Sequence, residues 1–165
     1  MVGAPLGHEL VVSLRMKWWA VSEHGLTPGA LSVAFFDAAA CGMPPGECPV
    51  TTSASDASSP GHFFGWPAQV SCLVWTFAPC AGGGNSGSCP VEGRTYLSYR
   101  DADGRVNSTS VDVEISRYRY TWDWRSVRVW LSGGVLYTDV DDGTFSLSLP
   151  VPGVRPTGAW ELALI

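Results

Sequence analysis

The chain has 165 residues, of which 45% are hydrophobic and only 15% are charged, and its formal net charge at pH 7 is −5. This negative balance gives no general attraction to phosphate backbones, so it disfavours a nucleic-acid partner. No apolar run reaches the length of a transmembrane helix, which argues against membrane insertion. The sparse charge indicates a surface that is partly covered, and we expect a homo-oligomer or polymer.

The fold class is indicated by the abundance of glycine and proline. There are 19 glycines and 12 prolines, and helix-forming runs are scarce, which favours an all-β fold. At this length the chain forms either one domain or two of roughly 80 residues that are marginally stable singly. We predict an antiparallel β-sandwich with one module over residues 1–90 and a second over residues 91–165, in tandem, interlocked or merged into one shared domain.

Hydrophobic alternation in the first half predicts a strand near the N-terminus, because side chains on one face of a strand recur at every second residue. A Thr-Pro-Gly turn at residues 27–29 then leads into a second strand. Ser-Ser-Pro-Gly at residues 58–61 precedes a predicted aromatic strand at Phe63 and Phe64. The first two strands cover residues 10–18 and 31–35, and a last strand in this half is predicted over residues 70–77.

The second half repeats this order of elements, although the gaps differ and there is no strict repeat period. The pair Asp142-Gly143 predicts a tight hairpin between two strands. After this turn, Phe145, Leu147 and Leu149 share one face. The predicted core-facing residues of the other strands are Val111, Val113, Ile115, Val127, Val129, Leu131, Trp160, Leu162 and Leu164.

Four of the cysteines flank short loops. Cys41 and Cys48 enclose a Pro-rich loop, and Cys80 and Cys89 enclose a Gly-rich one. We predict a local disulfide across each loop, which would persist in an oxidising setting such as a cell surface, a secreted fibre or a virion. A zinc site is the competing interpretation, but these spacings are not the paired motifs of zinc sites. Cys72 alternates with valines and is predicted to be buried in a strand.

A glycosylation sequon is a further feature of extracellular proteins. Asn107-Ser108-Thr109 matches the acceptor sequence for N-glycosylation, and we expect it in a turn. Such a triplet is meaningful only in a glycosylating host, so Asn107 is a candidate glycosylation site.

The sequence offers little catalytic chemistry. Residues 83–88 resemble the nucleophile loop of trypsin-like serine proteases, but no segment matches the one that carries the partner histidine. Aspartate clusters at residues 101–104 and 139–143 contain ligands for calcium, yet neither continues to the distal glutamate of an EF-hand loop, and hairpin turns explain both. We expect no catalytic residue, no metal and no cofactor.

Residues 117–125 alternate aromatic and polar side chains at period two. If the strand runs straight, the aromatic row faces solvent or a partner; a bulge near Ser116 would instead return it to the core, and both alternatives are open. An exposed row would stack on sugar rings or anchor a protein interface, because flat aromatic side chains bury a large area at little loss of rotamer entropy. The predicted binding residues are Tyr118, Tyr120, Trp122 and Trp124, with Arg117 and Arg119 at alternate positions.

Three short motifs stand out, two in the first half and one in the second half that is like the second of them. They are Pro28-Gly29 before a Val-rich strand, Ser55-Asp56 through Gly61-His62-Phe63, and Thr138-Asp139 through Gly143-Thr144-Phe145. These motifs resemble the transthyretin-like β-sandwiches of carboxypeptidase regulatory-like and Cna-B-like modules. The resemblance implies a small sandwich that serves as a structural spacer, stalk or pilus segment, or as a sugar-binding appendage. It does not account for residues 78–107.

These observations favour a non-enzymatic structural protein, a subunit of an extracellular filament, stalk or particle shell that self-assembles through edge strands and aromatic faces. Terminal strands at residues 10–18 and 160–165 are candidates for addition to a neighbouring sheet. The alternative is a carbohydrate-binding module that uses Tyr120, Trp122 and Trp124 as a platform. The expected location is extracellular or on the cell surface, with a virion as the alternative.

Overall fold

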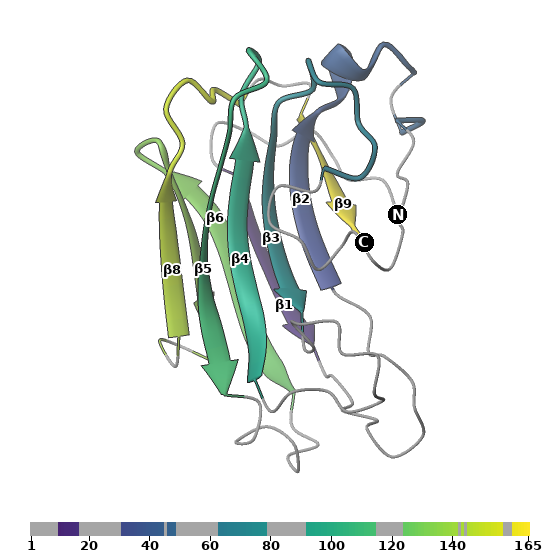
Figure 1. The fold of residues 1–165 in the computed structure, drawn as a ribbon. Coiled ribbons are helices and arrows are strands. Elements are labelled where there is room, and N and C mark those ends of the chain that lie inside the picture. Colours follow the sequence, from purple (N-terminus) through teal and green to yellow (C-terminus); the bar gives the residue numbers. More distant parts are fainter. Residues whose placement is uncertain are drawn as a thin grey trace, which may run out of the picture.

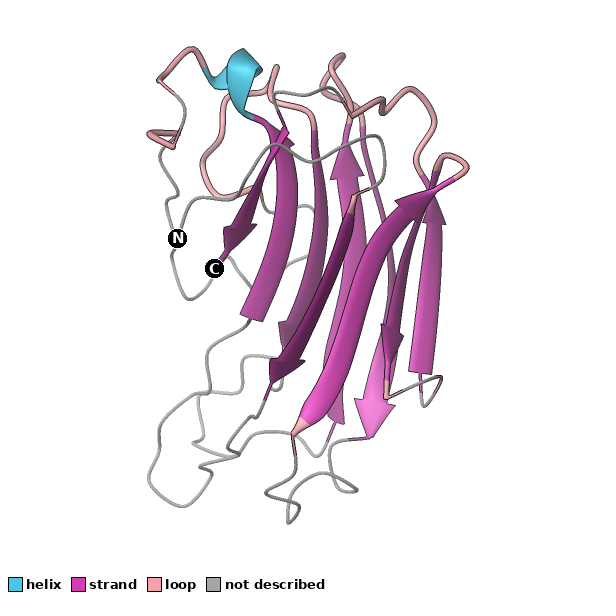
Figure 2. Ribbon diagram, turned by 180° about the vertical axis from the view of Figure 1, so that it is seen from behind, coloured by secondary structure: helices cyan, strands magenta, loops and turns pink. Residues whose placement is uncertain are grey.

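The computed structural model describes residues 10–16, 31–44, 46–48, 63–78, 92–114, 124–141, 143, 145–156 and 160–165. These residues form two antiparallel sheets that pack face to face (Figures 1 and 2). Within these ranges the only helical element is one short 3-10 helix, η1 (Ala38–Cys41). The predicted all-β sandwich is therefore confirmed.

One sheet, here called sheet A, contains β1 (Val11–Met16), β6 (Arg125–Ser132), β7 (Val135–Val140) and β8 (Phe145–Pro150). The other, sheet B, contains β2 (Leu31–Asp37), β3 (Cys72–Ala78), β4 (Glu92–Arg100), β5 (Val106–Glu114) and β9 (Trp160–Leu164). The strand orders are β1-β6-β7-β8 in sheet A and β5-β4-β3-β2-β9 in sheet B.

Strands from both halves of the chain occur in both sheets. In sheet A, β1 from residues 1–90 pairs with β6 from residues 91–165 and places Val12 opposite Val129. In sheet B, β9 pairs with β2 and places Phe35 opposite Leu162. The hydrophobic faces of the two predicted modules therefore contribute to one core, and both terminal strands lie at sheet edges.

The predicted alternation is clearest in sheet A, which has one face open to solvent. Val127, Val129 and Leu131 of β6 are at most 8% exposed, whereas Arg128 between them is exposed. The predicted hairpin joins β7 to β8, and Gly143 in its turn has a φ of 99°. Glycine suits this position because it has no Cβ to clash in the left-handed region.

The main core lies between the two sheets and is built around large side chains of sheet B. Phe35, Trp75 and Leu97 are fully buried there and pack with Val129 and Leu136 of sheet A. Burial of this apolar surface is the main driving force for closing the sandwich.

A second hydrophobic cluster covers the outer face of sheet B. Phe36 projects to this face and stacks on Trp66, with ring centroids 4.4 Å apart. Phe63 and Phe64, predicted to form a strand, instead lie in a turn, and Phe64 has a positive φ of 52°. Both side chains are buried in this cluster and therefore cover the outer face of sheet B.

Arg100 at the end of β4 fastens this covering segment to the sheet. Its guanidinium donates hydrogen bonds to the carbonyls of Val70, Trp66 and Pro67 at 3.0, 3.2 and 2.8 Å, and it lies over the ring of Phe63 at 4.8 Å. Arg100 is only 8% exposed, so these bonds satisfy a buried charge and three carbonyls of a segment without regular structure.

The predicted disulfide between Cys41 and Cys48 is present and clamps the loop that follows η1. Both half-cystines pack against the outer cluster. We expect the double variant Cys41→Ser/Cys48→Ser to lose about 2–3 kcal/mol of unfolding free energy, because the unfolded chain gains the entropy of an open loop. Urea denaturation measures the loss, and an unchanged transition midpoint would contradict it.

Cys72 is the free cysteine among the described residues, and it is buried in β3 as predicted. Burial raises the pKa of its thiol to about 12, and the nearby Arg100 opposes this increase only in part. The thiol is therefore neutral at physiological pH and acts as a small hydrophobic side chain. Cys80 and Cys89 lie outside the described residues, so their disulfide stays a prediction.

Candidate functional site

Two surfaces of the described structure combine exposure with binding chemistry. The first is the outer face of sheet A, and the second is the free side of β5, which we call the β5 edge. Of the predicted binding residues, the structure describes Trp124, which precedes β6 and is 57% exposed. The others, which lie outside the described residues, are Arg117, Tyr118, Arg119, Tyr120 and Trp122.

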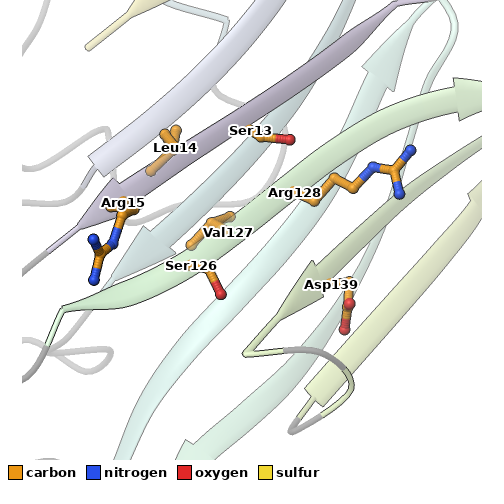
Figure 3. Close-up of a pocket in the computed structure, with 7 residues that line it drawn as sticks. All are labelled: Ser13, Leu14, Arg15, Ser126, Val127, Arg128 and Asp139. Atoms are coloured by element: carbon orange, nitrogen blue, oxygen red, sulfur yellow. The ribbon is translucent and has the colours of Figure 1, made fainter.

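The outer face of sheet A presents a row of polar side chains around a shallow depression of about 270 Å³ (Figure 3). Strand register assembles it, because Arg15 lies opposite Ser126 and Ser13 lies opposite Arg128. On the next strand, Asp139 lies opposite Arg128. Figure 3 shows the two arginines at opposite ends of the depression, with Ser126 between them.

Aromatic rings support both guanidinium groups. Arg15 lies 6.0 Å from the ring centroid of Trp124, and Arg128 lies 5.0 Å from that of Trp130. Trp130 is itself stacked on Tyr137, with centroids 5.1 Å apart and planes inclined by 13°. Such cation–π contacts orient a guanidinium and leave its N–H groups able to bind carboxylates or hydroxyls.

Asp139 contributes a carboxylate to the lining of the same depression. Its Oδ1 atom is buried and finds no hydrogen-bond partner within the described part of the chain. Such an atom is energetically costly, and because the protein itself covers it, it is not placed to accept a hydrogen bond from a ligand. The neighbouring Asp141 is different, because it accepts a hydrogen bond of 2.7 Å from Arg125.

Among the described edge strands of the two sheets, β5 is the longest. β5 has nine residues and pairs with β4 on one side, and no described strand pairs with its other side. Val106 and Val111 are 51% and 36% exposed. A strand of this length with one free side offers a row of backbone donors and acceptors to another chain.

Val111 was predicted to face the core, and the structure shows that its side chain is partly exposed. In register, Thr109 lies opposite Leu97, a main-core residue, and Val111 two residues later points to the same side. It is nevertheless 36% exposed, although β8, an edge strand of sheet A, lies beside β5 (Figure 1). A hydrophobic side chain in the core-facing register thus lacks a full cover from its own chain.

The outer side of β5 carries an ion pair between Asp112 and Arg94 of β4. The hydrogen bond from Arg94 lowers the pKa of the Asp112 carboxyl. Both side chains are well exposed, so the pair contributes little to stability.

Asn107 lies in β5 and not in the predicted turn, because residues 101–105 connect β4 to β5 and the strand begins at Val106. Its side chain is exposed, and its Oδ1 accepts a hydrogen bond of 2.9 Å from the Ser108 amide. Glycosylation at Asn107 stays a prediction.

The aspartate cluster at residues 101–104 forms the predicted hairpin turn. Oδ1 of Asp101 accepts hydrogen bonds from the amides of Asp103 and Arg105 at 3.0 and 2.9 Å. Within the described ranges there is no group of three or more His, Cys, Asp or Glu residues placed to hold a metal ion. The protease-like loop at residues 83–88 lies outside those ranges.

Comparisons with protein-family models, curated proteins and solved structures find no significant match to this chain. The resemblance to transthyretin-like modules therefore stays a prediction. Among the described residues, no helix has the length and hydrophobicity needed to cross a membrane. The Cys41–Cys48 disulfide is compatible with an extracellular location.

Sequence reasoning did not group the residues around the depression. The alternation of Ser126, Arg128 and Trp130 marks them as outward-facing. Which residues of β1 and β7 lie beside them depends on strand register, which alternation within each strand does not fix.

Proposed function

We propose that this chain is a non-enzymatic structural subunit that self-associates through the β5 edge. The observation that carries the proposal is the partly uncovered Val111 on a nine-residue strand with one free side. A second copy that pairs with this edge would satisfy the free backbone groups and cover the valine.

Two β5 strands can pair antiparallel about a two-fold axis at Ser110. In that register Asp112 falls opposite the partner's Ser108, so the two copies of this carboxylate do not face each other. The small side chains of Ser108 and Ser110 allow close approach of the two backbones. Pairing of this kind joins two copies of sheet B into one continuous sheet.

The terminal strands, predicted as candidates for strand addition, are less suited to it because each is anchored in its own chain. Trp160 of β9 is 2% exposed in the main core, and Ile165 exchanges two backbone hydrogen bonds with Ser32 at 2.8 and 3.0 Å. Leu10, beside β1, is fully buried, and its carbonyl accepts a hydrogen bond from Leu131. The β5 edge needs no such detachment.

The assembly that suits such a subunit is a filament, stalk or particle shell in an oxidising setting. A loop disulfide would be reduced in a reducing compartment, so the Cys41–Cys48 bridge supports a location outside the cell, at its surface or in a virion.

Sedimentation velocity over a concentration series tests the proposal. We expect the wild type to form dimers or larger species, and Val111→Lys to weaken association roughly tenfold or more, since a buried lysine charge is costly at an interface. Val11→Lys is the matched control, because Val11 is 38% exposed on the edge strand β1, and its association should equal that of the wild type.

Circular dichroism should show that both variants keep the β fold. A wild type that stays monomeric at all concentrations, or equal association by a folded Val111→Lys variant, would contradict the proposal.

A further inference from the structure

We propose that the depression on the outer face of sheet A binds an acidic oligosaccharide, one that carries uronate carboxylates. This inference goes beyond self-association and concerns a different surface, so the two proposals are tested independently. The residues that carry it are Ser13, Arg15, Trp124, Ser126, Arg128 and Asp139.

Trp124 supplies the stacking surface. It is the most exposed aromatic side chain among the described residues, at 57%, and it borders the depression through its contact with Arg15. An exposed indole presents a flat apolar face, which suits the C–H face of a pyranose ring, and it loses little rotamer entropy on binding.

The polar lining matches the hydroxyl groups of a sugar. The hydroxyls of Ser13 and Ser126 can each donate and accept a hydrogen bond, and Asp139 adds a carboxylate to the lining. A site that combines an apolar surface with a few placed donors and acceptors is the usual design of a small-molecule site.

Charge selects the class of sugar. The lining contains Arg15, Arg128 and Asp139, so it is locally positive on a chain whose net charge is −5. Guanidinium groups bind carboxylates in a planar, two-bonded geometry, and their ring contacts already fix their orientation. The two arginines lie at opposite ends of the depression, which suits an extended chain with charges on separate rings (Figure 3).

Other occupants are less well matched. A nucleic acid carries a negative charge on every nucleotide, and a lining with two arginines and one aspartate offsets few of them. A second copy of the protein would bind more favourably at the β5 edge, because backbone groups and a hydrophobic side chain are exposed there.

An array of immobilised neutral and uronate-containing oligosaccharides tests the inference, followed by titration calorimetry with the best uronate oligomer. We expect the wild type to bind uronate oligomers, and Trp124→Ala to weaken binding at least roughly tenfold while the protein stays folded. Arg128→Gln should reduce binding of uronate oligomers more than that of neutral ones.

Arg94→Gln is the control, because Arg94 is an exposed arginine of sheet B outside the depression, and its variant should bind like the wild type. The inference is overturned if the wild type binds no uronate oligomer, if it binds only neutral ones, or if a folded Trp124→Ala variant binds equally well. Binding of single-stranded DNA in place of sugars would also overturn it.

Discussion

Replacement of Arg100 by methionine is expected to lower the free energy of unfolding by about 3–5 kcal/mol. Methionine retains much of the aliphatic stem but takes the guanidinium donors away from the carbonyls of Trp66, Pro67 and Val70. The Pro67 carbonyl keeps a hydrogen bond from the Val70 amide. It also removes the contact with the ring of Phe63. Urea denaturation followed by tryptophan fluorescence gives the free energy.

Two further substitutions separate this role from a simple effect of charge. Arg100→Lys retains the charge but cannot direct a planar fork at three carbonyls, so most of the loss should remain. Arg105→Met is the control, because Arg105 is 78% exposed in a weak ion pair with Asp103, and stability should barely change. A decrease of less than about 1 kcal/mol in the unfolding free energy of Arg100→Met would contradict the anchoring role of Arg100.

Replacement of Trp75 by alanine is expected to cost about 3–5 kcal/mol, enough to unfold a marginally stable domain. Trp75 is fully buried in the central strand β3 and belongs to the main core, so its removal leaves a large cavity between the sheets. Thermal and urea denaturation measure the loss.

Trp75→Phe provides the comparison. The Nε1 donor of Trp75 has no partner among the described residues, and phenylalanine removes this buried polar group while it keeps an aromatic ring. We expect a loss of about 1–2 kcal/mol. Trp124→Ala, at an exposed position, should leave stability almost unchanged. Equal losses for the two Trp75 variants would contradict the proposed packing.

The fold was predictable where one face of a strand meets water. In β6 the alternation of valine with arginine and serine identifies the buried face directly. The β7–β8 hairpin was predictable for a different reason, since the Asp-Gly turn limits the backbone conformation locally.

Strand β4 was missed because both of its faces are buried. Thr95, Ser98 and Arg100 interrupt its hydrophobic residues and give it a polar appearance in the sequence. Thr95 is nonetheless compatible with burial, because its hydroxyl donates to the Thr76 carbonyl at 3.2 Å. Such compensation depends on the neighbouring strand, and the sequence of β4 alone does not contain it.

The same limit applies to the candidate surfaces. Trp124 was predicted as a binding residue from its own segment, whereas Arg15 and Asp139 join it only through pairing of β1 and β7 with β6. The exposure of Val111 depends on how completely the opposite sheet covers β5, which alternation within β5 cannot reveal.

Hydrogen–deuterium exchange of the backbone amides in β5 (Val106–Glu114), compared between concentrated and dilute protein, tests self-association through the β5 edge most directly. Amides on the free side of the strand should exchange slowly in concentrated solution and rapidly after dilution, while those of the central strand β3 stay protected in both. Rapid exchange of these β5 amides at every concentration would contradict pairing through this edge.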